Sequence, residues 1–190
     1  RKILLANAII YALPGAPIIY YGDEIGMGDN IWLFDRNGVR TPMQWHEGIN
    51  AGFSSADPDK LFAPVIETGA YTYEKVNVAA ESEDLESLLN KMRNLVNLRK
   101  VNPIFALGEY EFLAKDQPNC LVILRTFQGE NVLCVFNLTE KDNELTLNLS
   151  EFKGKKLQAL NENVIGLVKI EKMTKLNLRP YAFVWFLIKE

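Results

Sequence analysis

From Phe105 to the end of the chain, apolar and polar residues alternate with a period of two, and this pattern constrains the fold more than any other. Leu145, Leu147 and Leu149 alternate with polar residues, as in strands that bury one face. Such runs recur about every 8–12 residues, a spacing typical of an antiparallel sandwich or barrel. Aromatic residues such as Trp185 and Phe186 fall within apolar runs and are expected in its core. The predicted strands are 109–114, 120–127, 131–138, 144–149, 156–160, 167–170, 175–178 and 181–188.

The first half of the chain carries helical and irregular patterns instead. Residues 2–13 are apolar on nearly every helical face, which predicts a buried helix that ends at Pro14. Residues 17–21 form a short apolar run of β-prone types, which predicts a parallel strand covered on both faces. A long aperiodic stretch follows, of a kind that is more often functional than idle. A helix is predicted over residues 83–101, with Ser82 as its N-cap.

Composition excludes some classes of partner. The chain has 190 residues, 48% of them hydrophobic, and a net charge of −3, so it lacks the basic footprint of a nucleic-acid-binding protein. No apolar run reaches the ~20 residues of a membrane-spanning helix, so no membrane partner is expected. The chain starts at Arg1 inside a predicted helix and has no initiator Met, so a longer parent protein is expected.

Cys120 and Cys134 are the two cysteines, and they lie in predicted neighbouring strands. A turn at residues 128–129 would place Cys120 opposite Asn137 and Cys134 opposite Ile123. The two thiols are then out of register for a disulfide. Free, buried cysteines are therefore expected, which fits a reducing, cytoplasmic location.

Residues 36–45 read RNGVRTPMQW and form the most distinctive block of the chain. Two arginines stand four residues apart in a predicted loop, and a guanidinium is a planar donor suited to a carboxylate or a polyol. Trp45 offers a flat face on which a sugar ring can stack. The block follows Gly22-Asp23-Glu24 at the end of the predicted strand, where barrel enzymes keep their chemistry.

The order of these motifs resembles the C-terminal part of the α-amylase superfamily, glycoside hydrolase family 13, over essentially the whole chain. The likeness rests on YGDEIGM at residues 21–27, RTPMQW at 40–45, NAGF at 50–53 and the Leu-Arg-Lys helix. Within the superfamily, GDNIW at 28–32 and VNV at 76–78 are more similar to the trehalose synthase branch than to oligo-1,6-glucosidases.

The resemblance implies an α+β multidomain fragment. Residues 1–103 would be the last strand and helix portion of a (β/α)8 TIM barrel, with the long loop between the barrel's eighth strand and eighth helix, and residues 104–190 an antiparallel C-terminal β-sandwich. A whole barrel needs roughly 200–250 residues, so the family's nucleophile, acid/base and third carboxylate are expected upstream of residue 1. None of the motifs that carry them is present, so no catalytic residue is assigned and the chain alone is predicted to be inactive.

For the full-length parent, the resemblance implies an enzyme that interconverts maltose and trehalose, with no cofactor. Another α-glucoside is an alternative substrate, for an α-glucosidase or α-amylase that hydrolyses α-glucosidic bonds. An alternative of another class is a non-catalytic sandwich that binds a glycan or a subunit. In this chain, residues 1–80 would lack the strands on which they pack. The resulting apolar surface and open strand edge predict self-association.

Four residues are predicted to bind substrate. The family pattern supports Arg36 as the contact to the reacting sugar, with a salt bridge within the loop as its alternative. Arg40 is the second candidate, with bonds to loop carbonyls as its alternative. Trp32 and Phe34 are the first choices for an aromatic wall because they follow the strand end most closely.

The acidic residues near the strand end are expected to have structural roles. Adjacent strand residues point to opposite faces, so at most one of Asp23 and Glu24 can face a pocket. Glu24 is expected to hold the loop through Arg36 or backbone amides.

No metal site is predicted. Asp29, Asn30 and Asp35 match no calcium loop and are expected to form turns and caps. His46 has no histidine or cysteine nearby as a zinc partner and is expected to be a solvated loop residue.

Overall fold

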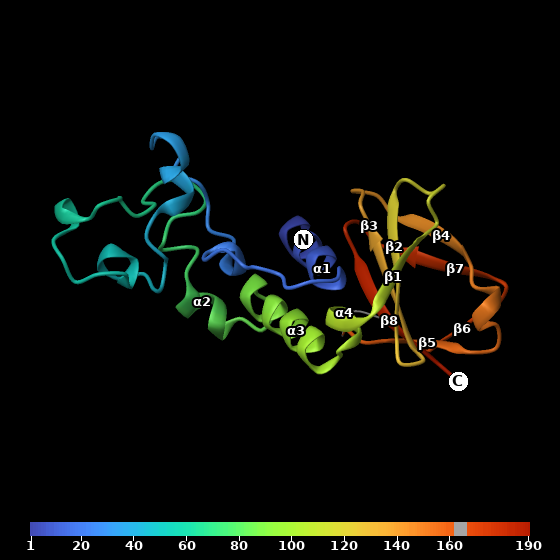
Figure 1. Cartoon of the computed structure of the whole chain (residues 1–190). Coiled ribbons are helices and arrows are strands. Elements are labelled where there is room, and N and C mark those ends of the chain that lie inside the picture. Colours follow the sequence, from blue (N-terminus) through green and yellow to red (C-terminus); the bar gives the residue numbers. More distant parts are fainter. Residues whose placement is uncertain (162–166) are drawn as a thin grey trace. The chain divides into compact units, whose positions relative to one another are not determined.

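The computed structural model describes residues 1–161 and 167–190 (Figure 1). The chain divides into two compact units, one of residues 1–17 with 94–190 and one of residues 18–93. The first unit therefore combines the N-terminal helix with the β-rich half of the sequence. The predicted boundary between residues 103 and 104 separates the barrel portion of the family from its sandwich. The division into compact units does not test that boundary, which stays a prediction.

The strands of the first unit are antiparallel and form two sheets in the described residues (Figure 1). The larger sheet has the order β1-β2-β3-β8-β5-β6, and β4 pairs with β7. All eight predicted strands are present with shifted ends: β1 Glu109–Leu113, β2 Cys120–Phe127, β3 Glu130–Asn137, β4 Asn143–Asn148, β5 Lys156–Ala159, β6 Val168–Lys169, β7 Met173–Leu178 and β8 Phe183–Lys189.

The hairpin of β2 and β3 has the predicted register. Its two turn residues have positive φ angles of 51° at Gln128 and 85° at Gly129, as a tight hairpin requires. Cys120 lies opposite Asn137, and Cys134 lies opposite Ile123, three pairs further along the ladder. Both thiols are free, as expected from the sequence, but only Cys134 is buried, whereas Cys120 is partly exposed.

The apolar faces of the two sheets pack against each other. Leu145 and Leu147 of β4 join Leu133 of β3 and Phe186 of β8 in one buried cluster. Fully burying one such side chain contributes about 1.5–3 kcal/mol, so the period-two alternation alone favours this arrangement. The predicted sandwich is thus observed, with its core between the six-stranded sheet and the β4–β7 pair.

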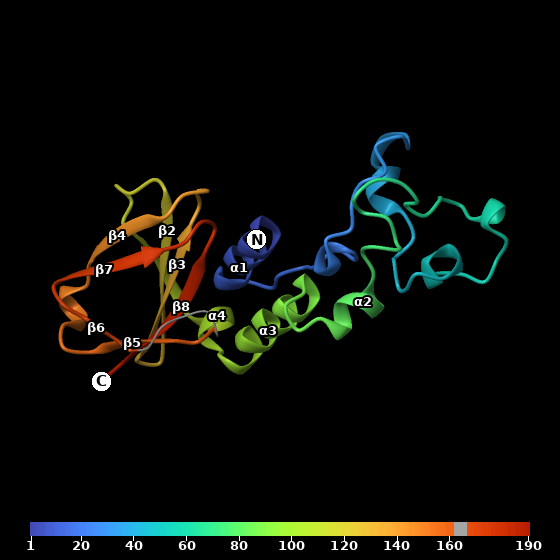
Figure 2. The same cartoon turned by 180° about the vertical axis from the view of Figure 1, so that it is seen from behind.

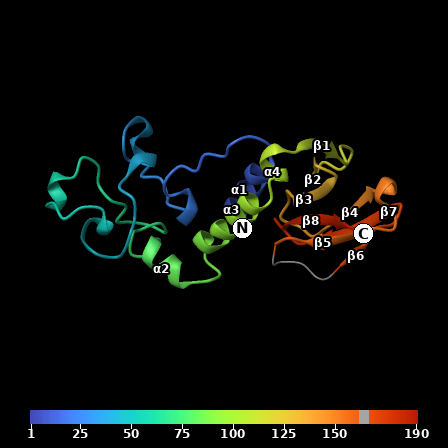
Figure 3. The ribbon, with the colours of Figure 1, turned by 60° about the horizontal axis from the view of Figure 1, so that its bottom comes forward.

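Two helices lie on the side of the larger sheet that faces away from β4 and β7 (Figures 1 and 3). They are α1, Lys2–Ala12, and the short α4, Ile104–Leu107, which the sequence did not predict. The ring centroids of Phe105 on α4 and Trp185 on β8 are 4.6 Å apart. Both side chains are fully buried, so this face of the sheet forms a second apolar layer.

Helix α1 is only partly buried, so the predicted burial on all faces is wrong. Leu5, Ala8 and Tyr11 are buried, whereas Ile3 and Ile10 are 44% and 46% exposed. One face of the helix packs within the first unit, and none of the unit's described elements covers the opposite face.

Two buried arginines bind the carbonyl groups at the C-terminal end of α1. Arg125 on β2 donates to the carbonyl oxygen of Ala12 at 2.5 Å, to Gly108 at 2.7 Å and to Glu109 at 3.1 Å. Arg99 donates to the carbonyl oxygens of residues 11, 13 and 15. Burial lowers the pKa of both guanidinium groups. The last turn of a helix lacks internal partners for its carbonyls, and these arginines supply them.

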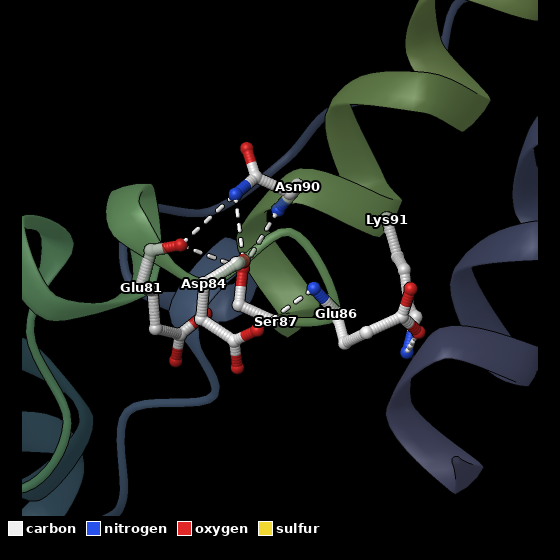
Figure 4. A network of polar contacts seen from close by, with 6 residues as sticks. All are labelled: Glu81, Asp84, Glu86, Ser87, Asn90 and Lys91. Carbon is white, nitrogen blue, oxygen red and sulfur yellow. Dashed lines mark hydrogen bonds and ion pairs between the residues drawn. The ribbon is translucent and has the colours of Figure 1, made fainter.

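The helix predicted over residues 83–101 is interrupted (Figure 4). It forms as α2, Val78–Glu83, and α3, Leu88–Val101. The Asn90 amide donates to the carbonyl oxygens of Glu81 at 3.0 Å and Asp84 at 2.8 Å, which lie at the end of α2. The Ser87 hydroxyl accepts from the backbone amide of Asn90 at 3.2 Å, and the Glu81 carboxylate accepts from the backbone amide of Leu89 at 2.9 Å. These side chains bind the free backbone groups at the end of α2 and at the start of α3. Because both ends are satisfied, two helices form instead of one continuous helix.

The N-cap predicted at Ser82 is therefore wrong. Helix α2 begins five residues before the predicted start, with Asn77 as its N-cap, whose Oδ1 accepts from the Ala80 amide at 2.8 Å. Figure 2 shows α2 and α3 from behind, joined by the short irregular link at residues 84–87.

Residues 17–21 form no strand, because residues 17–20 have no regular secondary structure and Tyr21 begins a turn, which corrects the second prediction for the N-terminal half. Ile18 is 92% exposed, and no strand of the described residues pairs with this segment. A strand requires a neighbour for its backbone hydrogen bonds, and an apolar pattern cannot supply one.

The second unit contains mostly turns, as its lack of periodicity predicted. Its short 3-10 helices are η1 Asp23–Ile25, η2 Asp35–Arg40, η3 Ile49–Gly52 and η4 Pro58–Lys60. A small apolar cluster of Ile25, Met43 and Leu89 links η1 to the start of α3. None of the helices in the described residues has the length and hydropathy that crossing a membrane requires.

Candidate functional site

A pocket of about 500 Å³ lies within the second unit. Apolar and aromatic side chains form most of its wall, and Glu24 and Arg40 are its two charged residues. The lining residues are Tyr21, Glu24, Arg40, Thr41, Pro42, Met43, Trp45, Phe53, Leu61, Phe62 and Ala63. Mostly apolar walls with a few convergent polar groups are typical of small-molecule sites.

Gln44 anchors the block that forms one wall of this pocket. Its side chain is fully buried, and its amide nitrogen donates to the carbonyl oxygens of Tyr71, at 3.3 Å, and Val76. In return, the backbone amides of Val78 and Ala79 donate to the carbonyl oxygens of residues 44 and 45, at 3.0 and 2.9 Å. The first free amides of α2 thus hold the chain at Trp45.

The turn at residues 50–53 positions Phe53. Asn50 and Ala51 have positive φ angles of 52° and 56°, and Gly52 has 72°. Asn tolerates this conformation, and its amide also donates to the carbonyl oxygens of Ser54 and Ala56, at 2.9 and 2.7 Å. The Ala51 carbonyl accepts from the Trp45 amide at 2.8 Å. The turn therefore brings two aromatic residues of the pocket wall together.

Tyr21 closes another side of the pocket. Its hydroxyl donates to the carbonyl oxygen of Thr41 at 3.1 Å, which ties the end of the segment at residues 17–21 to the Arg40–Trp45 block. Burial and the neighbouring Tyr20 raise the pKa of Tyr21, and the charge of Arg40 opposes this shift. The phenol is therefore neutral near pH 7 and acts as a donor.

Glu24 has the structural bond that the sequence predicted. Its carboxylate accepts from the Gly22 amide at 2.8 Å, and it also lines the pocket. Asp23 is exposed and does not line it. The two carboxylates separate as expected, although they lie in a 3-10 helix rather than a strand.

The two arginines have different positions. Arg40 lines the pocket, whereas Arg36 is exposed on η2 and does not. Within the described part of the chain, neither guanidinium has a hydrogen bond or ion pair to another residue. The alternatives considered for them, a salt bridge for Arg36 and bonds to loop carbonyls for Arg40, are therefore not observed. Their predicted role in substrate binding stays a prediction.

The predicted aromatic wall and the observed one differ. Trp32 and Phe34 are 86% and 87% exposed and do not line the pocket, and their binding role also stays a prediction. Phe53 and Phe62 line it and were not among the predicted site residues. The NAGF block could have indicated Phe53, whereas no pattern around Phe62 distinguishes it from other loop aromatics.

The remaining polar candidates form turns. The Asn30 side chain accepts from the Trp32 amide at 3.2 Å, and His46 Nδ1 accepts from the Gly48 amide at 3.0 Å. Asp35 has a positive φ of 54° at the start of η2. Among the described residues, no group of three or more histidine, cysteine or acidic side chains is placed to hold a metal ion.

The sequence matches models of carbohydrate-active proteins in both halves of the chain. The family model described as "Alpha amylase, catalytic domain" matches residues 1–108, and "Maltogenic Amylase, C-terminal domain" matches residues 110–185. The first match covers more than half of the chain. The chain therefore belongs to the α-amylase family.

Individual relatives refine this assignment. The chain is 40% identical to the trehalose synthase of Pimelobacter sp. strain R48, over 98% of this chain and 33% of that protein. It is 27% identical to the oligo-1,6-glucosidase of Parageobacillus thermoglucosidasius, over 90% of this chain and 35% of that protein. The chain thus spans about a third of the length of these relatives.

A solved structure shows the same fold. The trehalose-6-phosphate hydrolase of Bacillus licheniformis matches with a TM-score of 0.81 at 23% identity, over 100% of this chain and 39% of that one. At this identity the match establishes architecture alone. The chain has the fold of the corresponding portion of a TIM-barrel enzyme with its C-terminal β-sandwich.

Proposed function

We propose that the chain is the C-terminal portion of a trehalose synthase-type enzyme, which interconverts maltose and trehalose by intramolecular glucosyl transfer. The higher identity to the Pimelobacter trehalose synthase than to the Parageobacillus oligo-1,6-glucosidase supports this branch. The two free cysteines support a reducing, cytoplasmic location.

One observation supports the proposal that this chain supplies a pocket wall but not the catalytic carboxylates. Glu24 is the single carboxylate among the residues that line the pocket, and it already accepts a bond from its own loop. A retaining glycosidase needs two carboxyl groups about 5–5.5 Å apart, one as nucleophile and one as acid/base. We place both, and the third carboxylate of the family, upstream of residue 1. The chain alone is then inactive.

The pocket would serve the reaction as a wall for substrate. The Arg40 guanidinium is free to donate to sugar hydroxyls, and Trp45 offers a ring face. Isomerisation requires that freed glucose, rather than water, attack the glucosyl-enzyme intermediate. The mostly apolar lining supports a role in excluding water during that interval.

Product analysis of the full-length protein fed with maltose tests this proposal. We expect trehalose as the main product, with glucose as a minor one. Glucose without trehalose would contradict the synthase assignment and would indicate a hydrolytic α-glucosidase or α-amylase.

A second candidate of another class is glycan binding by the sandwich. One observation favours it: Tyr110 and Phe112 on the edge strand β1 are 51% and 39% exposed, with ring centroids 5.5 Å apart. Their rings could form an aromatic platform that the sequence patterns did not reveal. Maltoheptaose affinity that is lost in Tyr110→Ala would support this role, and unchanged or absent affinity would reject it.

We also propose that the isolated chain associates with itself. Phe62 and Ile18 are almost fully exposed, and Ile31, Trp32 and Phe34 are each more than 70% exposed. Exposed apolar surface of this extent favours association in water. Light scattering at increasing concentration is expected to show oligomers, and a monodisperse monomer would contradict the proposal.

A further inference from the structure

Three lysines lie directly opposite one another on neighbouring strands of the sandwich. Lys156 on β5 pairs with Lys169 on β6 on one side and with Lys189 on β8 on the other. These strands are adjacent at one edge of the six-stranded sheet (Figures 1 and 2). We call these three residues the lysine row.

The three side chains project from the same, outer face of the sheet. Directly opposed residues of an antiparallel pair point to the same face, with Cβ atoms about 4.5–5.5 Å apart. The neighbouring residues Leu157 and Ile188 lie in the core between the sheets, so the lysine row faces away from that core. All three lysines are exposed.

The charge of the lysine row is not compensated within the described residues. The ion pairs found there join Lys91 to Glu86, Lys155 to Glu190 and Lys175 to Glu144. None of them includes a member of the row. The register of β3 with β8, continued two residues beyond the Val132–Leu187 pair, places Glu130 opposite Lys189, yet among the described residues Glu130 forms no ion pair with the row. Like charges directly opposite each other in a sheet are destabilising, so the row favours any anion that can lie across it.

We propose that the lysine row binds the phosphoryl groups of a small phosphorylated ligand. Ammonium groups are point-charge donors that suit phosphate oxygens, and the anion would relieve the repulsion between three strands at once. A ligand with two phosphoryl groups can contact all three lysines and binds more tightly than a monophosphate. This proposal concerns the sandwich and is independent of the activity assigned to the pocket.

Thermal unfolding of the whole chain in phosphate, pyrophosphate or glucose 6-phosphate tests the proposal, with sodium chloride adjusted to constant ionic strength. Pyrophosphate well above its dissociation constant is expected to raise the Tm on the order of 5 °C, and phosphate by less. Glucose 6-phosphate distinguishes a sugar phosphate from inorganic phosphate as the source of the phosphoryl group. A shift equal to that of phosphate means recognition of the phosphoryl group alone, and a larger shift indicates a sugar phosphate.

Matched variants separate binding from general salt effects. Lys156→Gln removes the central charge, and Lys141→Gln removes an exposed lysine outside the row. The pyrophosphate shift is expected to vanish in Lys156→Gln and to persist in Lys141→Gln. In chloride alone, Lys156→Glu is expected to have a higher Tm than the unaltered chain because it pairs with both neighbours. No pyrophosphate shift in the unaltered chain, or an equal shift in Lys156→Gln, would overturn the proposal.

Discussion

Different interactions stabilise the sandwich and the second unit, residues 18–93, which we call the pocket unit. In the sandwich, alternating leucines and aromatics fill a continuous layer between two sheets. In the pocket unit the apolar cluster is small, and buried amide side chains such as Gln44 and Asn50 hold the turns by binding backbone carbonyls. Hydrophobic burial therefore dominates one region, whereas directional polar bonds dominate the other. The predictions below test this contrast, from the largest expected effect to the smallest.

Removing a core leucine from the sandwich is expected to have the largest effect. Leu133 is fully buried between the sheets, so Leu133→Ala should lower the free energy of unfolding by about 2–5 kcal/mol. Met43→Ala in the pocket unit should cost less because its small cluster can relax. Chemical denaturation measures the free energy of unfolding of both variants. An equal loss would contradict the inference that hydrophobic burial contributes more in the sandwich than in the pocket unit.

Arg125→Met should destabilise the first unit by about 3 kcal/mol, because three backbone carbonyls, including that of Ala12, lose a charged donor. Arg125→Lys keeps the charge but offers fewer directed donors, so an intermediate loss is expected. Denaturation gives the magnitudes, and hydrogen exchange at the amides of α1 shows where the loss occurs. If both variants matched the unaltered chain, the arginine would have no anchoring role.

In the full-length protein, Arg40→Ala should reduce kcat/KM for maltose by about 10–100-fold, equivalent to about 1.4–2.7 kcal/mol. Arg40 lines the pocket and has no partner among the described residues that would explain it structurally. Arg36→Ala is the matched comparison, since Arg36 lies outside the pocket wall. A larger loss for Arg36→Ala would show that substrate contact follows the sequence prediction rather than this pocket.

A matched pair of glutamines compares polar anchoring in the two regions. Gln44→Leu should cost about 1 kcal/mol, because the carbonyls of residues 71 and 76 lose a donor. The loss is moderated because Gln44 Oε1 has no partner within the described residues. Gln117→Leu breaks bonds to Thr146 in the sandwich.

Hydrogen exchange locates the effect of each variant. Gln44→Leu should accelerate exchange at Val78 and Ala79 and leave β4 protected, whereas Gln117→Leu should do the reverse. Acceleration across the whole chain in either variant would show that the two regions unfold as one.

The smallest effect concerns Glu81 at the junction of α2 and α3. Burial chiefly raises the pKa of Glu81 above the usual 4.5, opposed by the bond from the Leu89 amide and assisted by Asp84 and Glu24. The folded state then holds the proton more tightly than the unfolded state, so this residue's contribution to stability falls as pH rises above about 4.5. Because solvent screens this partly exposed carboxyl, the unaltered chain should lose well under about 1 kcal/mol relative to Glu81→Gln between pH 4 and 7. A relative gain in stability over that range would contradict the sign.

The same contrast explains how far the sequence alone predicts this molecule. Period-two alternation predicts all eight strands and the β2–β3 register, because a slip of one residue would turn Leu133 out of the core. Helix periodicity continues through residues 84–87, so it could not predict a break that depends on Ser87 and Asn90. The apolar run at residues 17–21 predicts a strand but not the neighbour that a strand needs.

The pocket was predictable in part. The Arg40–Trp45 block and the structural bond of Glu24 were visible as motifs. The left-handed turn at Asn50 and the hydrogen bonds of Gln44 decide which aromatic residues line the wall. Neither can be inferred from how closely a residue follows the predicted strand end. The predicted aromatic wall and the observed pocket lining therefore differ where a side chain's position depends on bonds between distant loops.

The most direct test of the account is an assay of the purified chain itself with maltose, after circular dichroism and cooperative unfolding have shown that it is folded. Glu24 is the single carboxylate among the pocket-lining residues, so the account predicts neither trehalose nor glucose above a no-protein control. Sustained formation of either sugar, proportional to protein concentration, would contradict it, because the chain would then contain a complete catalytic pair.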